Sequence, residues 1–273
     1  MYTRRTALSA ALLLPGMGMA QRMPPMPPVK VSGMVWQPDN ATARPQGEWQ
    51  RLGIQTLLIQ WLATDDGSGK LWRTPSLERL PAQPWAQSII AGLVGDYDEP
   101  RARRRVELLA QASARLAKEA LPFEPVGWYF PVESDPSWKE VNRLAESLQN
   151  LPRPLWVSAY DNSNLGPKAF ARWVRRWLPP DVGLFFQDGV GLHTRSAATA
   201  ARYALALADA VGWQRLKVIA EAFRPDGTGH FRSATALELR AQLSFYAGWP
   251  VLVFDGPHYL TPALVEALAQ SKP

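Results

Sequence analysis

The chain has 273 residues, no cysteine and a formal net charge of +6. Without cysteine, disulfides, thiolate metal sites and cysteine nucleophiles are excluded. The charge is a weak basic bias without a lysine and arginine stripe, so we expect no nucleic-acid interface. The one basic run, residues 101–105, falls at the start of an expected amphipathic helix and is interpreted as a solvated helix face.

The first twenty residues predict a cleavable export signal. Arg4 and Arg5 precede an apolar run, residues 7–14, which is too short to span a bilayer. Gly18 and Ala20 supply the small residues that a signal peptidase reads. The paired arginines favour the twin-arginine route, with an ordinary secretory signal as the alternative. We therefore expect a periplasmic or secreted protein with no membrane span after cleavage.

Removing these 20 residues from 273 leaves 253, close to the roughly 250 residues of one (β/α)₈ barrel. It also removes two arginines, so the net charge falls from +6 to +4. Residues 21–30 are rich in proline and methionine and are interpreted as an extended lead-in. Residues 31–273 are expected to form the folded domain.

Eight short apolar runs alternate with helical patterns along this domain. The expected strands are Val31–Gln37, Thr56–Trp61, Ser88–Leu93, Val126–Val132, Leu155–Ala159, Val182–Gln187, Leu216–Glu221 and Val251–Asp255. The expected helices are Gly47–Leu52, Arg101–Ala120, Ser137–Leu148, Lys168–Leu178, Ser196–Val211, Ala234–Ala247 and Pro262–Ala269. Residues 63–87 are expected to form a long loop and a short helix that overhang one end.

Strict alternation of strands and helices predicts parallel pairing, and thus an α/β fold. The alternative is an open doubly wound sheet, which usually carries a glycine-rich turn after its first strand. No such turn is present here. We therefore predict a single (β/α)₈ TIM barrel.

In such a barrel, polar residues at the carboxyl ends of the strands form the functional site. Here these ends combine carboxylates, amides and aromatic rings. Flat aromatic faces suit the apolar faces of sugar rings, and amides suit hydroxyl groups. The expected carbohydrate-binding residues are Trp36, Gln37, Gln60, Trp61, Tyr129, Tyr160, Gln187, Asp188 and Asp255. For Asp188, hydrogen bonding to a glutamate and capping of a turn are alternative roles.

Glu133 and Glu221, at the ends of the fourth and seventh strands, are the candidate catalytic pair. Hydrolysis of a glycosidic bond needs one carboxylic acid and a second carboxylate. Strand alternation places Glu133 on the same face as Tyr129 and Pro131, toward the barrel interior. The alternative is that either glutamate pairs with an arginine at the rim.

Several segments, in order along the chain, resemble the DUF4434 family, a domain of unknown function that forms glycosidase-like TIM barrels in exported bacterial proteins. They are residues 32–37 (SGMVWQ), 52–54 (LGI), 58–61 (LIQW), 127–133 (GWYFPVE), 158–160 (SAY), 187–191 (QDGVG) and 221–223 (EAF). The resemblance implies the barrel fold and a glycosidase-like site. One residue departs from the pattern of barrel glycosidases with glutamates on strands four and seven: Val132 stands where asparagine usually precedes the acid/base.

We expect an exported glycoside hydrolase that acts on a bacterial polysaccharide with retention and without a cofactor. Glu133 would be the general acid/base and Glu221 the nucleophile. A barrel that binds glycan without cleaving it, for polysaccharide synthesis or export, is the alternative.

A metal-dependent hydrolase is a third possibility, since Asp188, Glu221 and Asp255 could form an all-carboxylate site. Its usual histidine ligands are scarce, because the chain has only three widely spaced histidines. A Ser-His-Asp triad lacks the Gly-x-Ser-x-Gly elbow. The sequence does not identify the glycan or distinguish endo from exo action, and the charge only mildly favours an anionic polymer.

Overall fold

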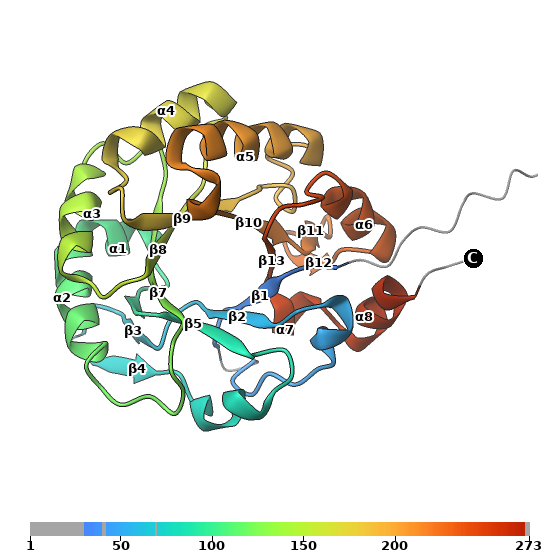
Figure 1. Ribbon diagram of the computed structural model, residues 1–273, viewed down its shortest axis with the longest axis horizontal. Coiled ribbons are helices and arrows are strands. Elements are labelled where there is room, and N and C mark those ends of the chain that lie inside the picture. The colour runs from blue at the N-terminus through green and yellow to red at the C-terminus, as the bar shows by residue number, and fades with distance from the viewer. Residues whose placement is uncertain (1–29, 40–41, 69, 271–273) are drawn as a thin grey trace, which may run out of the picture.

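The computed structural model describes residues 30–39, 42–68 and 70–270; the expected export signal and nearly all of the lead-in lie outside these residues. Eight parallel strands close into a barrel in the order β1-β13-β10-β9-β8-β7-β5-β2. In Figure 1 the first strand, in blue, lies beside the last, in red, and helices surround the ring. The barrel strands are β1 (Gly33–Trp36), β2 (Thr56–Ile59), β5 (Ser88–Gly92), β7 (Gly127–Ser134), β8 (Leu155–Ala159), β9 (Val182–Gln187), β10 (Leu216–Glu221) and β13 (Val251–Phe254).

This arrangement confirms the predicted TIM barrel and all eight predicted strands, which differ from the observed ones only at their ends. The strands were recognisable because a parallel barrel covers both faces, so that each strand is a nearly continuous apolar run. Within the described residues, no helix is both long and apolar enough to cross a membrane.

The helices also follow the predicted order, except that one is split, the first is a 3₁₀ turn, and a short helix at Gly256–Tyr259 was not predicted. The run after Arg101 forms two helices that meet at Arg105, whose guanidinium contacts Asp65. The helices are α1 (Glu99–Arg104), α2 (Val106–Leu116), α3 (Asn142–Ser147), α4 (Pro167–Trp177), α5 (Ala197–Val211), α6 (Ala236–Ser244), α7 (Gly256–Tyr259) and α8 (Pro262–Ala269), with 3₁₀ turns η1 (Trp49–Leu52), η2 (Leu77–Ala82), η3 (Leu148–Asn150) and η4 (Trp213–Arg215).

Two hairpins extend the barrel at its carboxyl-terminal end. The segment expected to be a long loop contains an antiparallel pair, β3 (Ala63–Asp65) and β4 (Leu71–Arg73), before η2. Strand β3 also pairs with β6 (Val94–Gly95), which makes a small three-stranded sheet. A second hairpin, β11 (Phe223–Pro225) and β12 (Phe231–Ser233), follows β10. Strands of three residues are too short to produce a readable alternation, so the sequence did not predict them.

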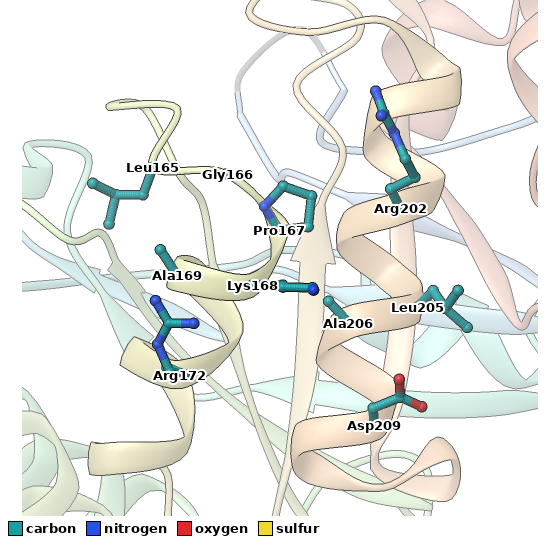
Figure 2. Close-up of a pocket in the computed structure, with 10 residues that line it drawn as sticks. All are labelled: Leu165, Gly166, Pro167, Lys168, Ala169, Arg172, Arg202, Leu205, Ala206 and Asp209. Atoms are coloured by element: carbon teal, nitrogen blue, oxygen red, sulfur yellow. The ribbon is translucent and has the colours of Figure 1, made fainter.

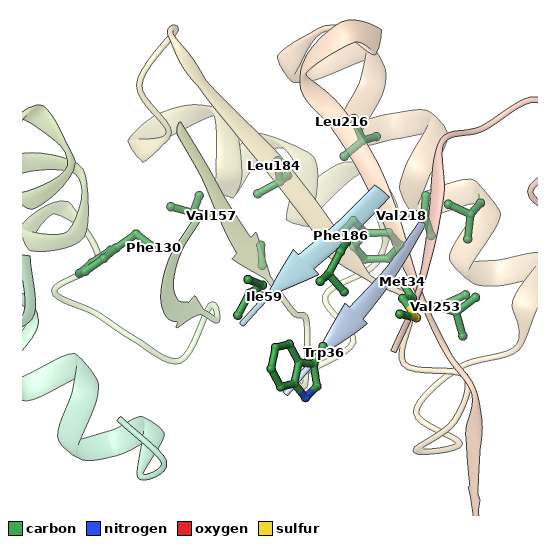
Figure 3. Packing of buried hydrophobic residues seen from close by; sticks show 14 of the residues in the cluster. Met34, Trp36, Ile59, Phe130, Val157, Leu184, Phe186, Leu216, Val218 and Val253 are labelled. Atoms are coloured by element: carbon green, nitrogen blue, oxygen red, sulfur yellow. The ribbon is translucent and has the colours of Figure 1, made fainter. Parts of the chain in front are cut away.

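The core has two layers, one on each face of the barrel. Inward side chains of seven strands form the inner layer: Val35, Leu58, Ile90, Tyr129, Phe185, Ile219 and Leu252. The outer layer lies between strands and helices and is shown in Figure 3, where Met34, Trp36, Phe130 and Phe186 belong to it.

Trp36 is therefore a core residue and not part of a carbohydrate groove. Its neighbour Val35 points into the barrel, so alternation turns Trp36 outward toward the helices. The indole is fully buried, and its Nε1–H donates to the carbonyl oxygen of Thr42 at 3.0 Å. The expectation that Trp36 binds sugar is wrong.

Three residues on neighbouring strands, Trp156, Gly183 and Lys217, pack together at the amino-terminal end of the barrel and form its floor. Trp156 of β8 lies across the backbone of Gly183 in β9, where any Cβ would collide with the indole. The ammonium of Lys217, on β10, sits 4.8 Å from the centre of the Trp156 ring. Burial lowers the pKa of Lys217, as expected for an ammonium removed from water.

The placement of Trp36 can be tested by stability. Replacing Trp36 with alanine should reduce the free energy of unfolding by about 3–5 kcal/mol, because a large buried side chain leaves a cavity. Thermal or denaturant unfolding measures the loss. Tyr97→Ala is the control, since Tyr97 is 54% exposed and its loss should cost far less. Equal, small effects of both changes would contradict the core assignment.

Candidate active site

Glu133 lies at the mouth of the barrel, one residue before the end of β7. Phe130 pairs with Val157 of β8 but Ser134 pairs with Ala159, so β7 carries extra residues at this point. The irregularity is a β-bulge, a feature that often reorients side chains beside active sites. The Glu133 carboxylate accepts a hydrogen bond from the side-chain amide of Gln187, two strands away on β9. Glu133 therefore points across the mouth, as predicted.

Glu221 is the last residue of β10 and is only 3% exposed. Its Oε2 accepts a hydrogen bond from the backbone N–H of Leu192 at 3.0 Å. The loop that follows β9 supplies this donor, and Gly191 lies so close that a Cβ there would stand 2.7 Å from the Glu221 Cβ. Glycine at position 191 is thus required for the loop to approach the carboxylate.

Burial raises the pKa of both glutamates. For Glu133 the value rises to about 7, mainly through burial, although the charge of Arg103 and the bond from Gln187 oppose the rise. For Glu221, burial and the charge of Asp188 raise the pKa, and backbone hydrogen bonds lower it. The charge of Glu133 adds to the rise at Glu221, so the two carboxyl groups lie within electrostatic reach of each other.

A third glutamate, Glu99 at the start of α1, was not identified from the sequence. Its Oε1 accepts the backbone N–H of Glu133 at 2.8 Å and lies 3.4 Å from Nε of Arg103. Burial, followed by the charge of Glu133, raises the pKa of Glu99 to about 8. Glu99 therefore fixes the backbone of Glu133, and the two carboxyl groups lie within electrostatic reach of each other.

Asp188 is fully buried and does not line an open groove, so its assignment as a sugar-binding residue is wrong. Its carboxylate accepts hydrogen bonds from Gln242 Nε2 at 2.6 Å and Tyr246 Oη at 2.9 Å, both after or within α6. It also accepts the backbone N–H groups of Val190 and Glu221 at 3.1 and 3.3 Å. Asp188 instead has the alternative role expected from the sequence. It accepts hydrogen bonds from the backbone of Glu221 and from Val190 in the turn after β9.

The predicted amides lie at the mouth with partly exposed side chains. Gln37 and Gln60 follow the adjacent strands β1 and β2, and Gln187 ends β9. The Oε1 atom of Gln60 is buried without a hydrogen-bond partner. These three amides are available for contacts with a ligand, together with Glu133.

The remaining predicted residues are buried. Tyr129 packs inside the barrel and its hydroxyl pairs with that of Ser158 at 2.8 Å, so it belongs to the core. Trp61 is 2% exposed and donates to the carbonyl oxygen of Pro38. Tyr160 is 7% exposed, and the charges of Glu221 and Glu133 raise its pKa in addition to burial. Of these three aromatic residues, only Tyr160 lies within electrostatic reach of both glutamates.

Asp255 is 5% exposed and lies beside the loop that follows β1. Its Oδ2 accepts the backbone N–H of Gln37 at 3.4 Å, and its Oδ1 has no partner. Burial raises the pKa of Asp255 well above the ordinary value. Asp255 thus joins the ends of β13 and β1 at the mouth, and its expected contact with a sugar stays a prediction.

Two arginines that the sequence did not single out hold the loops around Glu221. Arg195 donates to the carbonyl oxygens of Asp188 and Asp161 and lies over the ring of Tyr203. Arg224 donates to the carbonyl oxygen of Glu221 at 3.1 Å and to Gln242 Oε1 at 2.7 Å. Both are buried, and only their positions in the fold, not a sequence motif, identify them.

Away from the mouth, a cavity of about 660 Å³ lies on the outside of the barrel between α4 and α5. Figure 2 shows the side chains that line it, among them Lys168 and Arg172 on α4 and Arg202, Leu205 and Asp209 on α5. These side chains come from helices and not from strand ends. Within residues 30–39, 42–68 and 70–270, no three histidine, aspartate or glutamate side chains are grouped as a metal site would require.

No protein-family model and no curated protein matches the sequence. Solved structures do share the fold. A chain from Bacteroides thetaiotaomicron, provisionally described as an alpha-L-fucosidase, aligns over 97% of this chain and 95% of its own, with a TM-score of 0.59 and 16% identity.

Two further barrels align over 87% of this chain and 98% of their own. They are a class V chitinase from Pseudomonas fluorescens (TM-score 0.53, 12% identity) and the PgaB (BpsB) glycoside hydrolase domain from Bordetella bronchiseptica (TM-score 0.52, 14% identity). This chain thus shares the TIM-barrel fold with these solved structures.

The contact between Gly191 and Glu221 leads to a specific expectation. Gly191→Ala should displace the Glu221 carboxylate, since the added Cβ would lie 2.8 Å from the carbonyl oxygen of Phe223 and 3.0 Å from Glu221 Oε2. We expect a loss of about 1–3 kcal/mol in unfolding free energy, as for other overpacked sites. Gly127→Ala is the matched control, because its nearest neighbour would be an ordinary 3.4 Å away. Equal losses in urea unfolding would contradict this close packing.

Proposed function

We propose that this protein is a glycoside hydrolase acting on a bacterial polysaccharide, with Glu133 as general acid/base and Glu221 as nucleophile. The proposal rests on the burial of the two carboxyl groups and on the raised pKa of each. Both are desolvated at the mouth, and among the described residues neither forms an ion pair. A buried carboxyl group with a raised pKa and no ion-pair partner costs stability, which is typical of a functional site.

The surroundings of each glutamate support its proposed role. Glu221 is nearly inaccessible and is held by backbone N–H groups, which fix the direction of a nucleophile and stabilise its charge. Glu133 is partly exposed and is held by one neutral amide, so it can exchange protons with a leaving group and then with water. A retaining mechanism needs one carboxyl group in each of these two roles.

Glycan binding without cleavage is the second candidate, and one observation favours it. Val132, which stands where an asparagine is common in such barrels, is fully buried in the outer core. No polar side chain from this position can contact the sugar hydroxyl next to the reacting carbon. A retained affinity for glycan with no release of reducing ends would identify this second function.

Export and family membership complete the proposal. The twin-arginine start and small residues of the first twenty positions support a periplasmic or secreted location. The ordered segments described above support membership of the DUF4434 family. The proposed catalytic roles do not depend on export or on family membership. They depend on Glu133 and Glu221.

Glutamine substitutions test the catalytic pair. Glu133→Gln and Glu221→Gln should each reduce the release of reducing ends from a responsive bacterial polysaccharide by at least about 10³-fold, because each removes a group that the mechanism requires. Folding should persist, since glutamine keeps the size of the side chain and no ion pair is lost. Reducing-end assays across a panel of polysaccharides measure the loss. Retained activity in both variants would contradict the assignment.

The pH dependence provides an independent test. The active form has one proton on the pair, so activity falls at low pH, where both carboxyl groups are protonated, and at high pH, where both are ionised. Because the pKa of Glu133 is about 7 and that of Glu221 is also raised, the bell-shaped profile should centre near neutral pH and not near pH 5. With an aryl glycoside whose leaving group needs no protonation, the fall in activity at high pH should disappear. An acidic optimum for both substrates would refute the shared-proton pair.

A further inference from the structure

We propose that the cavity beside the β3–β4 hairpin is a second sugar subsite, which binds an uncharged ring of the same glycan at a distance from the cleaved bond. The identity of the ligand as a glycan rests on the proposed function. The cavity has a volume of about 420 Å³ and is lined by Asp39, Thr64, Asp66, Lys70, Trp72 and Tyr97. That volume lies within the usual range of about 300–1,000 Å³ for small-ligand sites.

The cavity lies at the same end of the barrel as the glutamates. Its residues come from the segments that follow β1, β2 and β5, and β5 is the direct neighbour of the Glu133 strand. Gly95 of β6 packs so tightly on β7 that a Cβ there would stand 3.0 Å from Pro131 Cγ, two residues before Glu133. Gly95 pairs with Thr64, which lines the cavity, so the small sheet beside the cavity packs on the strand that carries Glu133.

Tyr97 provides a rigid aromatic surface within this cavity. Its ring rests edge-on against Trp61, with ring centres 4.8 Å apart, and its hydroxyl donates to the carbonyl oxygen of Pro38 at 3.2 Å. Despite these two attachments the side chain is 54% exposed. A fixed and exposed aromatic face loses little conformational entropy on binding, which suits it to stacking against a sugar ring.

Trp72 provides the second aromatic ring. It pairs with Thr64 across the hairpin, so both side chains lie on one face of the two strands and both line the cavity. The hairpin is attached at its neighbouring residues: Arg73 donates two hydrogen bonds to Glu119, at 2.8 and 2.9 Å, and Arg105 pairs with Asp65 at 2.9 Å. The position of Trp72 is thus set before any ligand arrives.

The polar groups of the cavity indicate an uncharged ligand. Two carboxylates, Asp39 and Asp66, stand against one ammonium, Lys70. These groups can bind hydroxyls, whereas the excess negative charge would repel a uronic acid. The subsite therefore favours neutral sugar units, even though the net charge of the whole chain is positive.

A glycan that fills both sites must extend from Tyr97 to Glu133. The enzyme would then recognise an internal stretch of a polymer, and affinity should grow with chain length. Removal of either aromatic ring should weaken long ligands selectively.

Isothermal titration of the Glu133→Gln protein tests this subsite without hydrolysis. The probes are N-acetylchitohexaose and cellohexaose, the disaccharides of both series, and hexagalacturonate. We expect at least one neutral hexasaccharide to bind more tightly than its disaccharide. Adding Trp72→Leu or Tyr97→Leu, which keep apolar volume without a flat ring, should weaken that hexasaccharide about three- to tenfold and leave the disaccharide unchanged.

Phe245→Leu is the matched control, because Phe245 is an exposed aromatic residue at the end of α6 and should have no effect. Trp72→Phe should restore much of the affinity. Unchanged hexasaccharide binding in both leucine variants, tighter binding of hexagalacturonate, or no binding of either neutral hexasaccharide would overturn the subsite. Failure of the proposed function gives a different result: glycan binding that depends on Trp72 and Tyr97, but no hydrolysis by the unaltered protein.

Discussion

The geometry of the mouth depends on one buried carboxylate, that of Asp188. It accepts four hydrogen bonds and thereby joins the end of β9, the last residue of β10 and the carboxyl-terminal part of α6. Removing one partner of such a network leaves buried donors unpaired, at about 1–3 kcal/mol for each donor. Arg224 connects to the same network through Gln242 and contacts the backbone of Glu221. Glu221 is consequently held by groups that never meet a substrate.

The network also shapes the electrostatics of the mouth. Asp188 places negative charge beside Glu221, Asp135 places it beside Glu133, and Glu133 in turn raises the pKa of Glu99, while desolvation raises the pKa of all three glutamates. Arg103 offsets this rise only in part: its guanidinium donates to the backbone oxygen of Glu133 and lies 3.4 Å from Glu99, and its charge lowers the pKa of both glutamates. Burial of these carboxyl groups therefore costs folding stability while it raises their pKa. Carboxyl groups that retain protons near neutral pH are the result, and they are the groups that acid catalysis needs.

The sequence was sufficient for the barrel and for placing Glu133 and Glu221 at strand ends, and insufficient for the residues around them. Apolar runs and helical periodicity identified eight strands because these signals are local. Trp36 and Asp188 were misassigned because a strand-end position does not by itself state which way a side chain turns. Alternation from Val35 would have placed Trp36 outward. Glu99, Arg195 and Arg224 carry no local signal, since their roles arise from contacts between segments distant in the chain. Tyr97 was overlooked because the hairpin that surrounds it consists of strands too short to recognise.

The floor formed by Trp156, Gly183 and Lys217 divides the barrel into two ends with separate duties. The interior between them is filled by inward side chains, and the floor contributes packing and a cation–π contact. Residues at the mouth can therefore be substituted without disturbing the packing at the floor. The two hairpins, β3–β4 and β11–β12, lie outside the barrel ring and can diverge in length and sequence while the strands stay intact. In evolutionary terms, such a chain can acquire a new substrate by exchanging hairpins while keeping its folding core.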